Sequence, residues 1–329
     1  MCATAIHGLR SSLPEATLAL VIDTFDALVV ATFGRHLLVR DATARELKAR
    51  PFGRGLVIVA GDNVLCEDDV RNGETHVLEL RPRRNALYRS NLRGGSEPIV
   101  ANLSQLLVVL APNPKPDLFV LDRYLAAATS GGISATLVLN KSELGIEPDL
   151  QTQLDVYQAI GYDWLACSTR TGAGMDALLT ACAGDTSALV GQSGVGKSSL
   201  IRRLVPQADI EVGELVREEE GRHTTTASHL FDLPGGGSLI DSPGVRDFAP
   251  AIDRLDGGHL GFIEVARLSS QCRFTDCRHM REPGCAVIAA SEAGTMHPRR
   301  YESYRRLRRL FEELTEARGP QKRSPERRR

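Results

Sequence analysis

The chain has 329 residues, 42% of them hydrophobic and 25% charged, which is the composition of an ordinary soluble protein with room for about two or three domains. No apolar run approaches the roughly 18 residues that span a bilayer, and the N-terminus lacks the charged and apolar regions of a signal peptide. These features exclude membrane-spanning and secreted classes, so we expect a cytoplasmic protein without membrane contact.

The net charge of −1 hides an asymmetry along the chain. Residues 299–329 contain 12 basic and 5 acidic side chains, a net charge of +7, so the residues before them carry about −8. A basic C-terminal segment favours a polyanionic partner. The alternative is a solvated helix face followed by a frayed tail.

Short β-type runs separated by turn residues occupy the first part of the chain. After a loose lead-in over residues 1–17, strands are predicted at Ala27–Thr32, His36–Arg40, Leu56–Ala60, Asn63–Cys66 and Thr75–Leu80. Five short strands within about sixty residues suit a small β-barrel. The basic stretch 81–98, with its Gly and Pro residues, is interpreted as a linker that completes a first domain over 18–98.

Strands and helices alternate from Ile99 to about Pro250, which is typical of a parallel sheet with helices on both faces. The predicted strands are 106–110, 136–140, 163–167, 187–190 and 239–241, and the predicted helices are 118–129, 149–160, 175–182 and 197–204. The β signal disappears after Pro250. We therefore expect an α/β domain over 99–250, a helical domain over 251–317 that ends in a long helix from Pro298, and a disordered basic tail over 318–329.

Residues 191–198 spell GQSGVGKS, which matches the phosphate-binding pattern G-x-x-x-x-G-K-[ST] in the strand–loop–helix context that this motif requires. Backbone N–H groups of such a loop and the helix N-terminus bind phosphate oxygens. Lys197 is expected to reach the β- and γ-phosphates as a catalytic residue, and the Ser198 hydroxyl to bind Mg²⁺. The predicted nucleotide-binding residues here are Gly191, Gln192, Ser193, Gly194, Val195, Gly196, Lys197, Ser198 and Ser199.

Two further strand ends indicate guanine as the base. Asn140-Lys141-Ser142-Glu143 is similar to the N-K-x-D element, in which a carboxylate accepts the two N–H donors of guanine. Adenine lacks this donor pair, so the wrong base leaves a charge unpaired. Ser168 and Thr169 end the next predicted strand and resemble the loop whose backbone touches the guanine carbonyl. These elements favour GTP and GDP over the alternative of an ATP-dependent phosphotransferase.

Residues that sense Mg²⁺ and the γ-phosphate follow the phosphate loop. Asp241 ends an apolar strand and is expected to hold Mg²⁺ through water, while the N–H of Gly244 meets the γ-phosphate. In the segment Gly221–Thr226, Thr225 or Thr226 is expected to close over Mg²⁺, and the spacing does not choose between them. His223 in the same segment is a candidate for positioning or deprotonating the attacking water.

The order of these elements is a permutation of the Ras-like order, because the base-binding elements precede the phosphate loop. All these loops still meet at the carboxyl edge of one sheet, so a circularly permuted sheet is allowed. One consequence is that the loop after Gly244 leads directly into the C-terminal domain. Val245 also stands where Ras-like enzymes carry a water-positioning Gln, so we expect slow hydrolysis without a partner.

The chain has seven cysteines, and three of them fall within residues 272–285 together with a histidine. This clustering favours a metal site in a reducing compartment over disulfides. Cys272, Cys277, His279 and Cys285 form C-x4-C-x-H-x5-C, which supplies a closed tetrahedral shell for one structural Zn²⁺. The spacing does not exclude another thiophilic ion.

These motifs together resemble the ribosome small-subunit-dependent GTPase A family (RsgA/YjeQ). The resemblance rests on GQSGVGKSS, GRHTTT, DSPGVR, the Cys/His pattern and the preceding β-barrel, and it runs from about residue 20 to 315. It implies an OB-fold domain, a circularly permuted P-loop GTPase domain and a zinc-binding helical domain. It also implies a bacterial factor in late 30S subunit maturation, whose GTP hydrolysis the subunit stimulates. Glu143 departs from the family Asp, so we expect a weaker guanine preference.

The expected function is therefore a GTPase that uses Mg²⁺ with GTP, binds the 30S subunit and 16S rRNA, and acts as a monomer. Arg81, Arg83 and Arg84 are predicted to contact RNA phosphates, with strong salt dependence. The alternative is an RNA-binding assembly module that holds GTP as a structural ligand without useful turnover.

Overall fold

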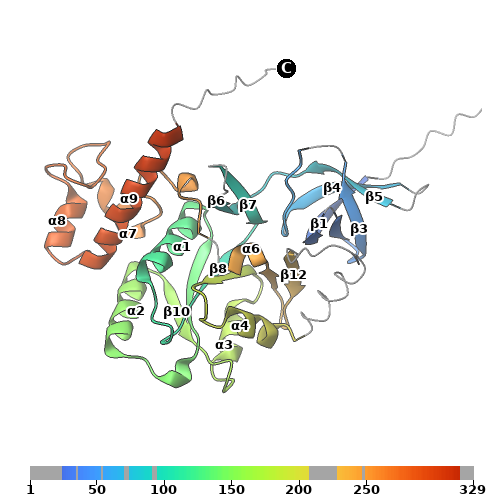
Figure 1. The fold of residues 1–329 in the computed structure, drawn as a ribbon, viewed down its shortest axis with the longest axis horizontal. Helices are drawn as coiled ribbons and strands as arrows, with labels where there is room; N and C mark the ends of the chain where they lie inside the picture. The colour runs from blue at the N-terminus through green and yellow to red at the C-terminus, as the bar shows by residue number, and fades with distance from the viewer. Residues whose placement is uncertain are drawn as a thin grey trace, which may run out of the picture.

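The structure is a computed structural model that describes residues 24–34, 36–52, 55–69, 74–90, 95–206, 228–246 and 249–318. A β-barrel and a helical region lie at opposite ends of a central α/β unit (Figure 1). The predicted fold class is confirmed. The predicted lead-in, the basic tail and the segment Gly221–Thr226 lie outside the described residues.

The barrel is a closed sheet of five strands, β1 (Thr24–Phe33), β2 (His36–Asp41), β3 (Glu46–Pro51), β4 (Asn63–Asp69) and β5 (Glu74–Leu80). The strand order is β1-β2-β3-β5-β4, and β4 pairs back onto β1. Alternate residues point inward, so that Val29, Val39, Val64 and Val77 are fully buried in the barrel core.

One predicted barrel strand is wrong and another was missed. The run Leu56–Ala60 forms no strand, because the buried carboxylate of Asp62 accepts the Val59 N–H and fixes an irregular loop instead. The missed strand, β3, buries only Ala49 and exposes charged residues on alternate positions. Its short apolar face therefore gives a weak strand signal.

The prediction of a linker over residues 81–98 is also wrong, because most of a β-hairpin lies there. Strands β6 (Ala86–Ser90) and β7 (Ser96–Ala101) pair antiparallel. Leu87, Ile99 and Val100 bury their side chains in the main core, whereas Arg84 and Arg89 are exposed. The solvent-facing charges hid the strand alternation in the sequence.

The central sheet has the order β10-β9-β8-β11-β13-β12. Its strands are β8 (Gln105–Leu110), β9 (Ser134–Leu139), β10 (Asp163–Ala166), β11 (Thr186–Gly191), β12 (Ser228–Asp232) and β13 (Ser238–Asp241). All pair in parallel except β12, which is antiparallel to β13 and was not predicted. The other five strands were predicted to within two residues at each end.

Helices cover both faces of this sheet, as predicted. They are α1 (Leu118–Ser130), α2 (Pro148–Ile160), α3 (Met175–Ala181) and α4 (Lys197–Leu204). Helices α1 and α2 pack with Leu106 and Val108 of β8, whereas α3 and α4 pack with Leu107 and Val109 on the other face. Strand β8 is buried on both sides, which explains its uninterrupted apolar sequence.

The sheet continues from the central unit into the barrel. Strand β12 pairs with β1 through Ala31 opposite His229 and Thr32 opposite Ser228. Arg40 of β2 adds an ion pair with Asp232 of β12, with an N–O distance of 2.9 Å. Among the described residues, eleven strands thus form one sheet, and the barrel is attached to the strand that precedes β13.

The C-terminal region contains η2 (Ile252–Arg254), α7 (Ile263–Ser269), α8 (Ala286–Glu292) and α9 (Pro298–Arg318), preceded by the short helix α6 (Pro243–Arg246). Helix α9 confirms the predicted long helix. Its residues Tyr304 and Leu307 pack with Phe262 and Val265 in a separate apolar core. No helix within the described ranges is long and apolar enough to cross a membrane.

A buried charge network holds α9 against the central unit. Asp122 of α1 accepts hydrogen bonds from Arg300 (2.6 Å) and Arg299 (2.7 Å), and the hydroxyl of Tyr157 in α2 also donates to it. Arg300 pairs in addition with Glu264 of α7 at 2.7 Å. Burial opposes the charge of Arg300, but Asp122 and Glu264 outweigh it and raise its pKa well above the ordinary value.

We predict that Arg300→Ala destabilises the protein by about 3–5 kcal/mol, because it leaves the Glu264 carboxylate without its Arg300 ion pair and the buried Asp122 with Arg299 as its cationic partner. Chemical denaturation followed by circular dichroism measures the effect. Arg309→Ala is the matched control, since Arg309 pairs with Glu302 on the exposed surface of the same helix. Equal denaturation midpoints for the two variants contradict the assigned role of the network.

Candidate functional site

The phosphate loop connects the end of β11 to the start of α4, as its motif predicts. Gly191 and Gly196 have φ angles of 146° and 96°, and a side chain at these positions would collide with the Val109 carbonyl and the Asn140 amide, respectively. Lys197 is buried, and its Nζ donates to the carbonyl oxygens of Gly191 (2.7 Å) and Gln192 (2.9 Å). The ammonium group therefore lies inside the loop that the motif reserves for phosphates.

Asn140 joins this loop to both base-binding elements. Its side chain is fully buried, and its Nδ2 donates to the Val195 carbonyl at 2.9 Å. Its Oδ1 accepts the N–H of Thr169 at 3.4 Å. One amide thus connects segments near residues 140, 169 and 195 and brings the three motifs to one edge of the sheet.

Lys141 lies across the phosphate loop. It takes the left-handed conformation with φ of 60°, and its Nζ donates to the carbonyl oxygens of Gly194 (2.8 Å) and Asn113 (2.9 Å). The aliphatic part of such a side chain offers an apolar surface while its charge is held at the far end. Sequence reasoning missed the contribution of Asn113, which has no motif of its own.

Glu143 is exposed and ionised beside Ser168. The hydrogen bond from the Ser168 side chain is the largest cause that lowers the pKa of Glu143, and the nearby charges of Arg170 and Lys141 act in the same direction. Ser168 itself is fully buried, and Ser142 N–H donates to the Cys167 carbonyl at 3.1 Å. The Glu143 carboxylate, which is predicted to accept the N–H donors of guanine, therefore lies close to the ends of β9 and β10.

Asp241 ends β13, and the residues after it form a small hydroxyl network. The Ser242 Oγ accepts hydrogen bonds from the hydroxyl of Ser228 (2.7 Å) and from the N–H of Gly244 (3.2 Å). The Gly244 N–H predicted to meet the γ-phosphate is thus bonded to Ser242 in this structure. Ser228 begins β12, and no sequence motif pointed to it.

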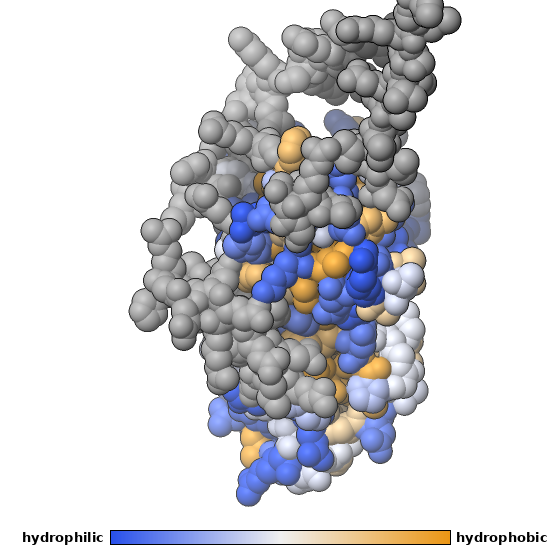
Figure 2. Space-filling view, turned by 90° about the vertical axis from the view of Figure 1, so that its right-hand side faces the viewer, coloured by the Kyte–Doolittle hydropathy of each residue, from blue (hydrophilic) through white to orange (hydrophobic). Residues whose placement is uncertain are grey.

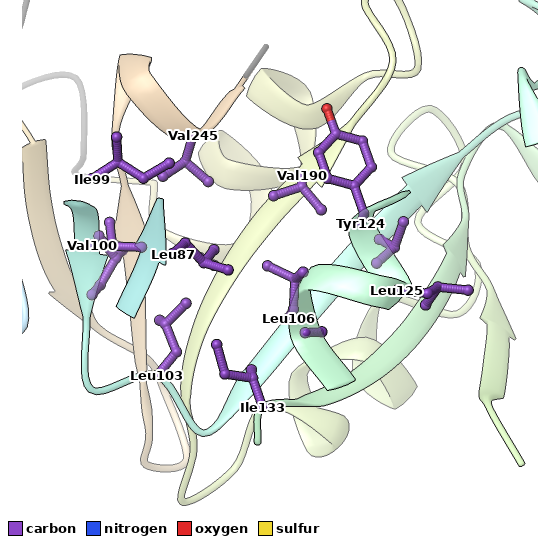
Figure 3. Close-up of a cluster of buried hydrophobic side chains, with 14 of the residues drawn as sticks. Leu87, Ile99, Val100, Leu103, Leu106, Tyr124, Leu125, Ile133, Val190 and Val245 are labelled. Atoms are coloured by element: carbon purple, nitrogen blue, oxygen red, sulfur yellow. The ribbon is translucent and has the colours of Figure 1, made fainter. Parts of the chain in front are cut away.

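Val245 faces the interior and not the phosphate loop. Its side chain is buried beside Ile99 in the main core (Figure 3). A side chain in this position does not orient water at the nucleotide. His223, Thr225 and Thr226 lie outside the described residues, so their assigned roles stay predictions.

The Cys/His cluster converges as its spacing predicts. The ligand atoms of Cys272, Cys277, His279 and Cys285 all lie within 4.8 Å of one another. The His279 Nδ1 is 3.5 Å from the Cys272 Sγ and 3.4 Å from the Cys285 Sγ. Burial raises the pKa of the Cys277 thiol to about 12, and only a bound cation would reverse this effect. Three sulfur atoms and one imidazole nitrogen fit a thiophilic metal ion.

The loop around this cluster is held in place by neighbouring groups. Tyr301 donates to the His279 carbonyl at 2.9 Å, and Tyr304 donates to the Arg278 carbonyl at 3.0 Å. Burial opposes ionisation of Glu282, but hydrogen bonds from backbone N–H groups outweigh it and lower the pKa of Glu282 to about 2. Helix α9 and one carboxylate therefore orient the ligands.

Comparison with known proteins decides the family. The family model for the RsgA GTPase matches residues 80–250. The small ribosomal subunit biogenesis GTPase RsgA of Azotobacter vinelandii is 45% identical over 291 residues, which cover 86% of this chain and 84% of that protein. The protein of the same name from Pseudomonas aeruginosa strain LESB58 is 41% identical over 283 residues, with 85% and 83% covered. This chain belongs to the RsgA GTPase family.

Solved structures agree with this placement. YjeQ from Thermotoga maritima is 27% identical, with a TM-score of 0.67 over 89% of this chain and 99% of that protein. YloQ, described as a circularly permuted GTPase, has the same TM-score over 91% of this chain and 98% of its own, and at 24% identity it supports the fold alone. The permuted motif order predicted from the sequence is therefore that of an RsgA GTPase.

We predict that Asn140→Ala weakens the binding of both GDP and GTP by about 10- to 100-fold, because the variant loses a buried amide that bridges three loops. Isothermal titration with each nucleotide measures the change. Asn63→Ala, an exposed asparagine of the barrel, is the control and should bind like the wild type. Unchanged affinity of the Asn140 variant would contradict this assembly of the site.

A second prediction concerns the metal. One metal ion per chain should copurify with the protein, and Cys285→Ser should remove it and lower the thermal stability of the helical region. Elemental analysis and thermal unfolding measure both quantities. Cys182→Ser is the matched control, since Cys182 is buried among the described residues but lies outside the cluster. Full metal occupancy in the Cys285 variant contradicts the assignment.

Proposed function

We propose that this chain is a GTPase that acts in the biogenesis of the small ribosomal subunit, as the names of its relatives state for them. The observation that carries the proposal is the buried Asn140 amide, which ties the guanine-type element to the phosphate loop. A phosphate loop alone does not distinguish GTP from ATP, so the proposal needs the guanine-type element beside it. Glu143 in place of the usual Asp moves the carboxylate by one methylene, so guanine preference is weaker than in relatives with Asp.

Different residues of the site would bind the phosphates and the Mg²⁺ ion of bound GTP. Lys197 would exchange its two carbonyl partners for β- and γ-phosphate oxygens, and Gly244 would exchange Ser242 for the γ-phosphate. Ser198 and Asp241, with Thr225 or Thr226, would hold Mg²⁺, which supplies charge neutralisation on the phosphates. His223 is our candidate for positioning or deprotonating the attacking water, a role that the buried Val245 side chain cannot fill.

The Cys272, Cys277, His279 and Cys285 cluster holds one structural Zn²⁺ in our proposal. All four positions of a tetrahedral shell come from the protein, so no position is open to substrate. The ion would stabilise a segment that is rich in polar residues and whose apolar core is small. A cytoplasmic, reducing location agrees with thiols that form no disulfide among the described cysteines.

The partner is the small subunit, contacted through 16S rRNA by a monomeric protein. Phe52 is 66% exposed on the barrel and lies edge-on to His76, which suits stacking of unpaired bases. Hydrophobic residues lie between hydrophilic ones on the barrel side of the molecule (Figure 2). The predicted RNA arginines need one revision, because Arg83 is committed to the buried Asp62 at 2.7 Å. Arg84 stays exposed and is the better phosphate contact.

We predict slow GTP hydrolysis by the isolated protein and an acceleration on the order of 10³-fold when purified 30S subunits are added. Phosphate release titrated with subunits measures this effect. Lys197→Ala should abolish turnover in both conditions. Equal rates with and without subunits would contradict stimulation. Normal release of the Lys197 variant from the particle would instead favour an RNA-binding module that holds GTP as a structural ligand.

A further inference from the structure

A cavity of about 240 Å³ lies beside the start of the phosphate loop. Residues 191–193 form one wall, Arg123 and Tyr124 of α1 form another, and Ala249 and Pro250 close it from the segment that follows α6. Tyr124 packs next to Val190, the residue before the loop (Figure 3). The cavity therefore joins the phosphate loop to the chain that leaves the Gly244 region.

Arg123 brings to this cavity a positive charge without an ion-pair partner among the described residues, although Asp117 attracts it from a longer distance. One of its amino groups donates to the Pro250 carbonyl at 3.2 Å, whereas its Nε is buried without a hydrogen-bond partner. No acidic side chain within the described ranges forms an ion pair with it. Burial is the largest influence on the guanidinium and lowers its pKa. Arg123 as a whole is half-buried, and an anion bound beside it would offset the cost of the buried Nε and of the desolvated charge.

Helix α1 is fixed in the orientation that points Arg123 at the cavity. At its start, the Asp117 N–H donates to the Gln192 side chain of the phosphate loop at 3.0 Å. The residue before Arg123, Asp122, is bound by Arg299 and Arg300 of α9. The guanidinium is thus positioned by contacts on both sides of it, so little conformational entropy is lost when it binds an anion.

The geometry points to a phosphoryl group as that anion, and we propose that Arg123 contacts the γ-phosphoryl oxygens of bound GTP. This inference rests on the proposed GTPase function. In a phosphate loop the Lys ammonium reaches the β- and γ-phosphates, and the Lys197 Nζ here bonds to the carbonyl oxygens of Gly191 and Gln192, which line the cavity. The planar guanidinium fork matches phosphoryl oxygens, and an arginine supplied by the same chain stabilises their charge in other GTPases.

If Arg123 contacts the γ-phosphoryl group, it should strengthen the binding of GTP and leave the binding of GDP unchanged. Arg123→Gln should weaken a non-hydrolysable GTP analogue on the order of 10- to 100-fold and leave GDP affinity within about twofold, with Arg123→Lys between these limits. Isothermal titration in the presence of Mg²⁺ measures both affinities. Arg309→Gln is the matched control, because Arg309 pairs with Glu302 on the exposed surface of α9 and does not line the cavity. It should bind both ligands like the wild type.

Three results would overturn the assignment. An equal loss of GDP and analogue affinity would show that Arg123 only packs α1 against Pro250, and unchanged affinities would show no role in binding. If only the binding of inorganic phosphate to the GDP complex falls, Arg123 holds the product and not GTP. Failure of the wild type to bind either nucleotide is a different outcome, because it contradicts the proposed function itself. Arg123→Lys keeps the test valid if the Gln variant does not fold.

Discussion

The nucleotide site depends on one buried amide. Asn140 is fully buried, and its two polar atoms bond to the backbone at Val195 and Thr169. These bonds define the distance between the base-binding loops and the phosphate loop. Gly196 must lack a side chain because this amide lies against it. The permuted chain order does not disturb the arrangement, because each loop leaves the carboxyl end of its strand at the same sheet edge.

Two connections extend from this site to the rest of the molecule. On one side, Ser242 bonds to Ser228 of β12, and β12 pairs with barrel strand β1. On the other side, α1 contacts the phosphate loop through Asp117 and α9 through Asp122. Gly244, the predicted γ-phosphate contact, is therefore connected to the barrel through Ser242 and β12, and the phosphate loop is connected to the helical region through α1.

The phosphate loop and the Cys/His cluster were predictable because all the residues that each one needs lie within a short stretch of the chain. The phosphate loop needs glycines with positive φ, and a Cys/His cluster needs four donors at short spacing, so both are visible in the sequence. Strands β8 and β11 were predictable because burial on both faces gives continuous apolar runs. Helices α1 and α9 were predictable from their length and periodicity.

The features that were not predicted are stabilised by residues that lie far away in the sequence. Strand β12 is recognisable only through its pairing with β13 and β1, and the 81–98 hairpin only through the core that Leu87 and Val100 enter. Arg83 looked like an RNA contact because its partner Asp62 lies 21 positions earlier. Arg123 had no motif, since its environment is built from α1, the phosphate loop and Pro250.

The central claim is that these strand ends form a single guanine-nucleotide site. Its most direct test is the affinity of the wild-type protein for GDP and for ADP, measured by calorimetry in the presence of Mg²⁺. We predict that GDP binds on the order of 100-fold more tightly, because the ionised Glu143 carboxylate has no donor pair to bind on adenine. Equal affinity for the two nucleotides, or no binding of GDP, would contradict the account.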